Sequence, residues 1–189
     1  ILTGEKHGTV TIMLENEGYE VTTYRIDGEY SDGRHPKNVM FSTNLIEDLA
    51  RRDFTINAIA ADVNGNIIDP FNGQEDLKNK ILRTVGNPTE RFSEDSLRLI
   101  RALRFAVRYD LSIEYETSNA INKLAYTINR VSKERITAEF EKLFNYNKPI
   151  SKVFLEYSSL ITEIIPEIKS CIDFEQNKYH KHNVYEHLL

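Results

Sequence analysis

A run of arginines three or four residues apart, between Phe92 and Arg108, constrains the fold of this sequence more than any other feature. The arginines are Arg98, Arg101, Arg104 and Arg108. A helix with about 3.6 residues per turn places all four along one stripe and the apolar side chains from Leu99 to Val107 on the opposite side. The run therefore predicts a helix with one core face and one cationic face.

The helix is expected to begin at Ser93, whose hydroxyl can cap it. Glu94 and Asp95 then fall in the first turn, where the helix dipole favours acids. Arg98 lies four residues after Glu94 and can pair with it, but the next two arginines have no acid at that spacing. We expect an anionic partner for them from elsewhere; the alternative is a solvated arginine face.

The composition is that of a globular protein, with 189 residues of which 40% are hydrophobic and 28% charged. No apolar run reaches the roughly 20 residues of a membrane span, and the first residues do not resemble a targeting peptide. The single Cys171 cannot form an internal disulfide, which favours a cytoplasmic location. The net charge of -5 disfavours indiscriminate coating of nucleic acid, so we expect a local basic site and no DNA or membrane partner.

Both ends of the sequence look cut. The chain opens at Ile1 without methionine, and it stops at Leu189 inside a segment, Asn183–Leu189, that predicts a helix. We therefore expect a fragment of a longer protein.

Two alternating segments, Val10–Leu14 and Tyr19–Arg25, predict a β-hairpin. Glu20 lies in the second strand, where its carboxylate is either a solvated strand residue or an acid of a metal site. Residues Ile26–Asn38 combine turn formers with aromatic and basic side chains. They predict a mobile loop, which is either a lid over an anionic ligand or an ordinary surface loop.

Arg51 and Arg52 precede a segment in which Asp53 can cap a helix that reaches Ala60. Two guanidinium groups beside the free amides of a helix start can hold phosphate. The alternative is an ordinary pair of surface arginines.

Turn formers divide the following residues into short elements. Asn64–Gly65 predicts a tight hairpin turn, Asp69–Leu77 a turn that leads into a short helix, and Ile81–Val85 a strand that closes the β-containing part. Beyond Pro88 glycine disappears and the period is helical, with Ser132 as a candidate N-cap. The second half is therefore expected to be all helix.

Five segments, in this order, resemble the motifs of class II tRNA nucleotidyltransferases, the CCA-adding enzymes, and their bacterial poly(A) polymerase relatives. The segments are RRDFTINAIA (Arg51–Ala60), DPFNGQEDL (Asp69–Leu77), ILRTVG (Ile81–Gly86), EDSLRLIRALRF (Glu94–Phe105) and VSKERITAEF (Val131–Phe140). The resemblance implies an α+β chain, in which part of a polymerase-β-like head with β-hairpins and short helices precedes an all-α neck and body. The expected divisions are 1–87 for the C-terminal part of the head, 88–148 for the nucleotide- and RNA-binding neck, and 149–189 for the body helices.

The resemblance also implies roles for single residues. Arg52 would contact the nucleotide triphosphate, and Asp95 with Arg98 would read the base in place of a nucleic-acid template. Arg101 and Arg104 would complete the nucleotide pocket. A catalytic role falls to Glu20, which matches the family's third acidic position, while Arg51, Asp53 and Asn57 match a motif with less certain roles.

Two features of the family are missing from the sequence. The GGxxRD segment and the Asp-x-Asp pair of its palm do not precede His7, and we expect them upstream of Ile1. Mg²⁺, the expected cofactor, would be bound mostly by those aspartates, so the fragment alone should be inactive. Residues 180–187 resemble the opening of an HD phosphohydrolase domain, but a single helical His187 gives no reason to assign a metal ligand.

The resemblance implies template-independent addition of CMP and AMP, from CTP and ATP, to the 3′ end of tRNA. Poly(A) polymerase activity is the alternative within the same family. A non-catalytic RNA-binding helical module, or part of a phosphohydrolase, is the alternative from another class.

Overall fold

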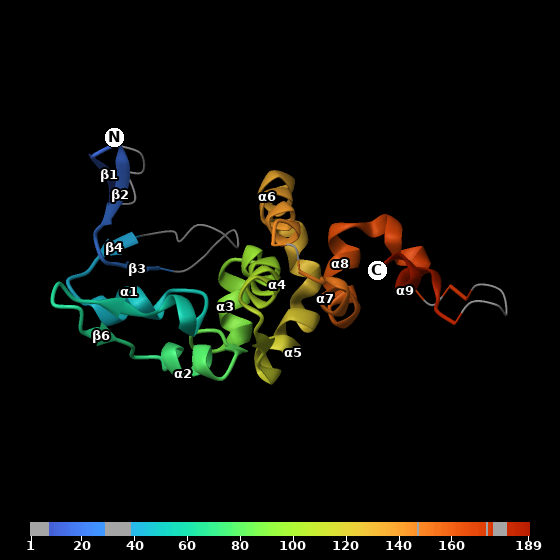
Figure 1. Ribbon diagram of the computed structural model, residues 1–189. Coiled ribbons are helices and arrows are strands. Elements are labelled where there is room, and N and C mark those ends of the chain that lie inside the picture. Colours follow the sequence, from blue (N-terminus) through green and yellow to red (C-terminus); the bar gives the residue numbers. More distant parts are fainter. Residues whose placement is uncertain (1–7, 29–38, 147, 173, 176–180) are drawn as a thin grey trace.

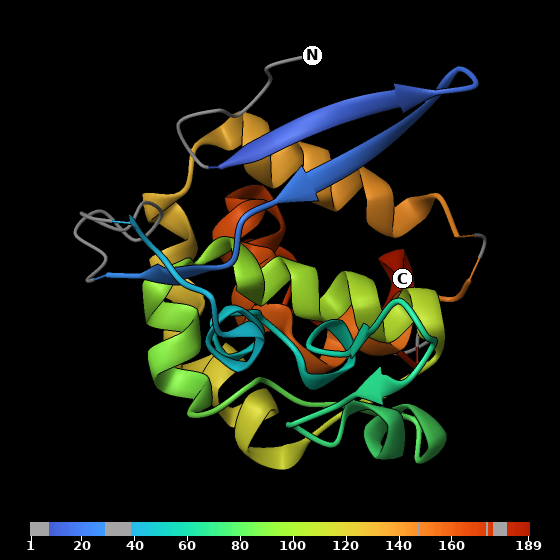
Figure 2. The same ribbon diagram turned by 90° about the vertical axis from the view of Figure 1, so that its left-hand side faces the viewer.

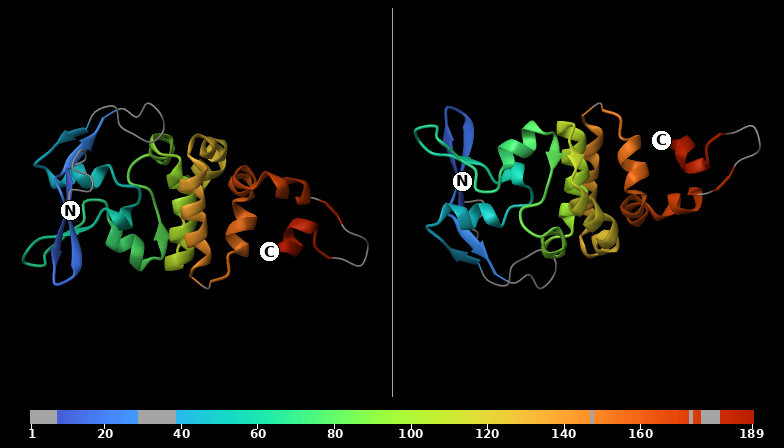
Figure 3. Two further views of the ribbon diagram at one scale, coloured as in Figure 1. Left: turned by 90° about the horizontal axis from the view of Figure 1, so that it is seen from above. Right: turned by 90° about the horizontal axis from the view of Figure 1, so that it is seen from below.

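The computed structural model describes residues 8–28, 39–146, 148–172, 174–175 and 181–189. Figures 1 and 3 show the elements as a row, with the strands of the N-terminal part at one end, α3 to α6 in the middle and the C-terminal helices at the other end. Most of the loop predicted at Ile26–Asn38, residues 29–38, lies outside the described residues.

The predicted N-terminal hairpin is confirmed. Strand β1 (Thr9–Leu14) pairs antiparallel with β2 (Glu17–Thr22), and the turn between them places Glu15 and Asn16 at φ 49° and 68°. The second strand stops at Thr22 and not at Arg25, because the chain pairs again as β3 (Arg25–Asp27) with β4 (Val39–Phe41).

Helix α1 (Leu45–Ala50) begins at Asn44, whose side chain accepts a hydrogen bond from the amide of Ile46. The helix predicted after Asp53 is reduced to a single 3₁₀ turn, η2 (Thr55–Asn57). It stops there because the chain enters strand β5 (Ala60–Ala61), which pairs with β6 (Ile67–Ile68).

The predicted Asn64–Gly65 hairpin joins β5 to β6, with Gly65 at φ 84°. The short helix predicted next is α2 (Gly73–Lys78), which packs on η2 so closely that a Cβ on Gly73 would lie 2.2 Å from the carbonyl oxygen of Thr55. Strand β7 (Ile81–Leu82) is shorter than predicted. It pairs in parallel with β8 (Ser112–Ile113), so the expectation that no strand follows Pro88 was wrong.

The stretch from Phe92 to Arg108 spans two helices, not one, and all four arginines of the run lie in the second. Helix α3 (Pro88–Glu94) starts after Asn87, and α4 (Leu97–Tyr109) follows a break where Asp95 is extended, with φ -143° and ψ 104°. The start predicted at Ser93 was wrong because the extended Asp95 interrupts the helix there. Helix α4 begins after Ser96, and Oδ1 of Asp95 accepts a hydrogen bond from the amide of Leu97 at 3.1 Å.

Helices make up most of the remaining chain. In order they are α5 (Tyr115–Leu124), η3 (Ala125–Arg130), α6 (Lys133–Phe144), α7 (Ser151–Glu156), α8 (Ser158–Ile164), η4 (Pro166–Cys171) and α9 (Val184–Leu188). Ser132 occupies the N-cap position of α6 as predicted, although its side chain forms no capping hydrogen bond. Within the described ranges, no helix is both long and apolar enough to cross a bilayer.

The main hydrophobic core is centred on α4 and continues into the N-terminal part. Phe54 and Leu82, which precede α3 in the chain, are fully buried in the same cluster as Leu99, Ile100 and Leu103. Figure 2 shows α4 and α6 side by side, and the two helices pack against each other. The end of the β-containing part of this α+β structure therefore shares one hydrophobic core with α4.

Candidate functional site

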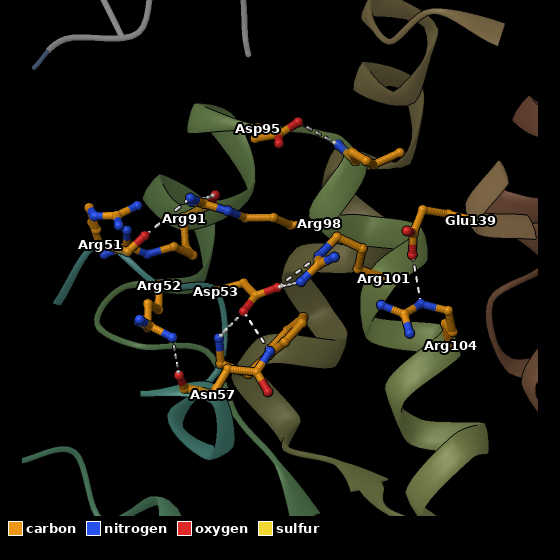
Figure 4. Close-up of polar contacts among 12 residues, drawn as sticks. Arg51, Arg52, Asp53, Asn57, Arg91, Asp95, Arg98, Arg101, Arg104 and Glu139 are labelled. Carbon is orange, nitrogen blue, oxygen red and sulfur yellow. Dashed lines mark hydrogen bonds and ion pairs between the residues drawn. The ribbon is translucent and has the colours of Figure 1, made fainter. Parts of the chain in front are cut away.

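A cavity of about 580 Å³ opens where the N-terminal part meets α4 and α6. Its lining includes five arginines and two aspartates, namely Arg51, Arg52, Arg98, Arg101, Arg135, Asp53 and Asp95. Figure 4 shows that the labelled side chains among them come from the end of α1 and the residues after it, the break between α3 and α4, and α4 itself. Arg135 comes from α6. The arrangement is cationic, concave and polar, as an anion site requires.

Arg98 is anchored on three sides and is 9% exposed. Its Nη1 donates to the Glu94 carboxylate at 2.6 Å and to the carbonyl oxygen of Arg91 at 2.9 Å. Its Nη2 donates to the carbonyl oxygen of Arg51 at 3.2 Å. The predicted pair with Glu94 is therefore confirmed, and the guanidinium also ties α4 to the end of α1.

Arg101 finds the anionic partner that its helix lacks. Its Nε and Nη2 donate to Oδ2 of Asp53 at 2.8 and 2.5 Å, while Oδ1 of Asp53 accepts from the amide of Phe54 at 3.0 Å and from the side chain of Asn57 at 2.8 Å. The expected partner from elsewhere is thus a carboxylate of the N-terminal part. This bond joins the two parts of the chain at the cavity wall.

Arg104 is not among the residues that line the cavity. Its Nε donates to Glu139 of α6 at 2.6 Å, and its guanidinium lies 4.3 Å from the ring centre of Phe105. Burial lowers the pKa of Arg104, but hydrogen bonds and charges at Tyr146 and Glu139 outweigh burial and raise it. Figure 4 shows this pair to one side of the cluster around Asp53. Arg104 is therefore buried under α6, meaning between α4 and α6, and does not face the cavity.

Asp95 lines the cavity from the break between the helices, not from a helix face. Its Oδ2 accepts a hydrogen bond from Nη2 of Arg135 on α6 at 3.1 Å. The Nη1 atom of Arg135 is buried without a hydrogen-bond partner. Sequence reasoning gave Arg135 no role, although it lies within the VSKERITAEF segment that carried part of the resemblance.

Arg51 and Arg52 come at the end of α1 and not ahead of a helix start. The predicted cradle of guanidinium groups beside free helix amides is therefore not formed, because η2 is only one turn long. The Nη1 atom of Arg52 donates to the carbonyl oxygen of Asn57 at 3.1 Å, and its Nη2 donates to Asp48 at 3.3 Å. Asp48 was not predicted: it follows Glu47 in the first turn of α1, and the sequence alone does not show that Asp48 is buried while Glu47 is exposed.

Glu20 lies on β2, exposed and opposite Thr11, and does not line the cavity. Across the residues that the structure describes, no three or more Asp, Glu, His or Cys side chains are grouped so that they can hold a metal ion. His187 lies exposed on α9. The described acids and histidines therefore do not form a Mg²⁺ site, and the catalytic role of Glu20 stays a prediction.

Two family comparisons cover most of the chain. Residues 1–83 match the family described as "Poly A polymerase head domain", and residues 110–172 match "Probable RNA and SrmB- binding site of polymerase A". The first match contains Arg51, Arg52 and Asp53 of the cavity, and the second contains Arg135. The class is therefore that of the poly(A) polymerases, with a head-domain match followed by a match to the region described as their probable RNA-binding site.

Similar proteins narrow this class. The chain is 54% identical over 141 residues to the CCA-adding enzyme of Oceanobacillus iheyensis, a match covering 75% of this chain and 35% of that protein. It is 43% identical over 183 residues to the CCA-adding enzyme of Ligilactobacillus salivarius, covering 93% of this chain and 45% of that protein. The chain belongs to the family of CCA-adding enzymes and poly(A) polymerases, and spans less than half the length of these two relatives.

A solved structure agrees with this assignment. The crystal structure of the Bacillus stearothermophilus CCA-adding enzyme in complex with CTP matches with a TM-score of 0.73 and 41% identity. The match covers 83% of this chain and 38% of that chain. The family and the fold predicted from the sequence motifs are thereby confirmed.

Proposed function

We propose that the protein is a tRNA nucleotidyltransferase that adds CMP and AMP, from CTP and ATP, to the 3′ end of tRNA. The observation that carries the proposal is the cavity in which Asp95 and Arg98 face the same space as Arg51 and Arg52. The similarity of the chain to CCA-adding enzymes, one of which was solved in complex with CTP, supports this substrate class.

The phosphate end of the nucleotide is assigned to Arg52, with Arg51 beside it. Both guanidinium groups line the cavity, and Arg52 is 44% exposed and so accessible to a ligand. Arginine forms charge-assisted hydrogen bonds with phosphate oxygens, and these are stronger than bonds between neutral groups. Because five arginines face two aspartates around the cavity, a triphosphate would enter a region of net positive charge.

The base end is assigned to Asp95 and Arg98. An ionised aspartate only accepts hydrogen bonds and an arginine only donates them. Cytosine and adenine offer an amino group beside an unprotonated ring nitrogen, which matches this pair. Uracil and guanine offer a carbonyl and a ring N–H, which would leave both side chains facing the wrong partner.

The other predicted residues receive more limited roles. We propose that Arg104 acts through α6, where its bond to Glu139 holds the helix that carries Arg135. Arg101 completes the wall through Asp53. Mg²⁺ is proposed as the cofactor and Glu20 as an acid near it, but the described residues supply no ligand set for the ion. The divisions 1–87, 88–148 and 149–189 remain part of the proposal.

Asp95→Ala tests the proposed function in a complete protein that contains this chain. In the unmodified protein, Asp95 would face a carbonyl of UTP or GTP, and each unpaired buried polar group costs about 1 to 3 kcal/mol. Removing Asp95 removes this penalty, so we expect kcat/KM for UTP and GTP on a tRNA acceptor to rise relative to that for CTP and ATP. Glu116→Ala, an exposed acid on α5, is the control and should leave the preference unchanged.

Three outcomes separate the alternatives. An unchanged preference for C and A in Asp95→Ala would remove this residue from base selection. Incorporation of ATP alone by the unmodified protein would favour poly(A) polymerase. Binding of RNA without preference among free nucleotides would favour a non-catalytic module.

A further inference from the structure

Asp48 is a buried carboxylate of α1 that is only 4% exposed and does not line the cavity. Nε and Nη2 of Arg51 donate to its Oδ1 at 2.9 and 2.6 Å. Nη2 of Arg52 donates to its Oδ2 at 3.3 Å, and the backbone N of Arg25 lies 3.4 Å from Oδ1. A single carboxylate therefore contacts two neighbouring arginines of the cavity wall and the first residue of β3.

The charge of Asp48 is stabilised in this position. Burial raises the pKa of Asp48, but the hydrogen bond and charge of Arg51, together with hydrogen bonds from Arg25 and Arg52, outweigh burial and lower the pKa. The carboxylate is therefore ionised at neutral pH, and its attraction for both guanidinium groups is present before any ligand arrives.

Arg52 is held at two points of its guanidinium plane. Its Nη2 is bound to Asp48 and its Nη1 to the carbonyl oxygen of Asn57. A guanidinium carries five N–H groups in a rigid fork, so two fixed contacts define its plane and leave other N–H groups for a ligand. Figure 4 shows Arg52 directed toward Asn57 at the edge of the Asp53 cluster.

We propose that Asp48 is the positioning residue for the phosphate-binding end of the cavity. It holds Arg51 and Arg52 in place in the free protein, so that a nucleotide does not have to immobilise two flexible side chains when it binds. The inference rests on the proposed function for the identity of the ligand, a nucleoside triphosphate. Asp48 accordingly affects the part of the affinity that depends on phosphate and not the part that depends on the base.

Removing the carboxylate has a second, opposite effect that the experiment must separate. Without Asp48 the cavity becomes more positive, which attracts phosphate over a longer range. This attraction between exposed charges is screened at a Debye length of about 8 Å in roughly 0.15 M salt and of about 3 Å in 1 M salt. The loss of positioning acts at contact distance and survives higher salt.

The test compares CTP and cytidine binding to the 189-residue chain and to Asp48→Asn, by NMR titration at about 0.15 and 0.5 M salt. Asparagine keeps the size of the side chain and removes its charge. We expect the Kd for CTP to rise about tenfold at the higher salt, since ordering each arginine takes part of the binding energy, while the Kd for cytidine stays within about twofold. Glu47→Gln, an exposed acid of the same helix, is the matched control and should change neither value.

A double-mutant cycle with Arg52→Ala distinguishes positioning from a general structural effect. If Asp48 acts through Arg52, Asp48→Asn weakens CTP binding less in the Arg52→Ala background than in the unmodified chain. Additive losses, or a parallel loss of cytidine binding, would overturn the proposal. Asp48→Ser, which also removes the carboxylate, replaces Asp48→Asn if the latter shows no cooperative thermal unfolding; unchanged CTP binding in that folded variant would also overturn the proposal. Failure of the unmodified chain to bind CTP would contradict the proposed function instead.

Discussion

Arg101 and Arg104 are three residues apart on the same face of one helix, yet their environments are opposite. Arg101 lines the cavity, is 29% exposed as a side chain and is bound by Asp53 of the N-terminal part. Arg104 lies under α6, is 8% exposed and is paired with Glu139. The difference shows that the element packed above an arginine, and not its position in the stripe, decides whether its charge serves a ligand or the fold.

Arg108 extends the comparison beyond α6. Its guanidinium lies 5.0 Å from the ring centre of Tyr109 and 5.5 Å from that of Tyr146. No described carboxylate forms an ion pair with it, so Arg108 matches the solvated alternative considered from the sequence. A single stripe therefore contains two cavity residues, Arg98 and Arg101, together with a buried structural residue and a surface residue.

The largest expected effect is on stability and concerns Arg104, the arginine of the stripe that α6 covers. Arg104→Met leaves Glu139 buried, with Lys142 at 2.9 Å as its remaining cationic partner. We expect the free energy of unfolding to fall by about 3 kcal/mol, because the buried carboxylate loses the one partner that is buried with it and keeps only the half-exposed Lys142. Urea unfolding followed by circular dichroism measures the change.

Two further variants complete this test. The double variant Arg104→Met/Glu139→Met should recover most of the lost stability, since it removes both buried charges. Arg108→Ala should lie within about 0.5 kcal/mol of the unmodified chain, as surface substitutions usually do. Equal destabilisation by Arg104→Met and Arg108→Ala would show that α6 does not bury the former as described.

The next effect belongs to the cavity and concerns ligand binding. Arg52→Ala should weaken CTP and ATP binding alike by about 1.5 to 3 kcal/mol, because a phosphate contact is common to both nucleotides. Calorimetric titration of the two nucleotides measures it, with Arg130→Ala, an exposed arginine of η3, as the control. A loss confined to one nucleotide would place Arg52 at the base and not at the phosphates.

The smallest effect is on the pH dependence of stability and concerns Glu139, the partner of Arg104. Burial raises the pKa of Glu139, but Lys142 and Arg104 outweigh burial and hold it below the ordinary value of 4.5. A carboxylate with a lowered pKa contributes stability above its unfolded pKa, and this contribution is lost as the pH falls through the folded pKa. Glu139→Gln should therefore show a shallower loss of stability below about pH 5, measured by urea unfolding at each pH. An identical slope in both proteins would mean that Glu139 does not contribute to acid unfolding.

Much of the local structure could be predicted because its signals are local. Asn64–Gly65 demands a tight turn, the alternation in Val10–Leu14 demands a strand, and both are observed. Strand β7 was predicted within Ile81–Val85, but its partner β8 was not, because Ser112–Ile113 is only two residues long and lies about thirty residues away in the chain. The break at Asp95 was missed because the residue types of 93–105 suit one helix, whereas the structure has an extended backbone at Asp95, whose side chain binds the amide of Leu97.

The site was predicted in part. Sequence motifs identified Arg52, Asp95, Arg98 and Arg101, and the structure places all four around one cavity. Their functional roles remain proposals, as does that of Glu20, which lies on the exposed hairpin. Arg135 was missed because its partner Asp95 lies 40 residues away in the chain. Asp48 precedes Arg51 and Arg52 at helical spacing, but its burial, which the sequence does not show, is what distinguishes it from an ordinary surface acid.

The sequence by itself determined the family, the order of the elements and the arginine stripe, since each depends on residue type and spacing along the chain. Only the tertiary structure decided which arginines reach the cavity. That outcome depends on Asp53, which is 48 residues from Arg101 in the chain, and on Glu139, which is 35 residues from Arg104. Helical period fixes the direction of a side chain, but burial and the charge of its partner are fixed by what packs against it.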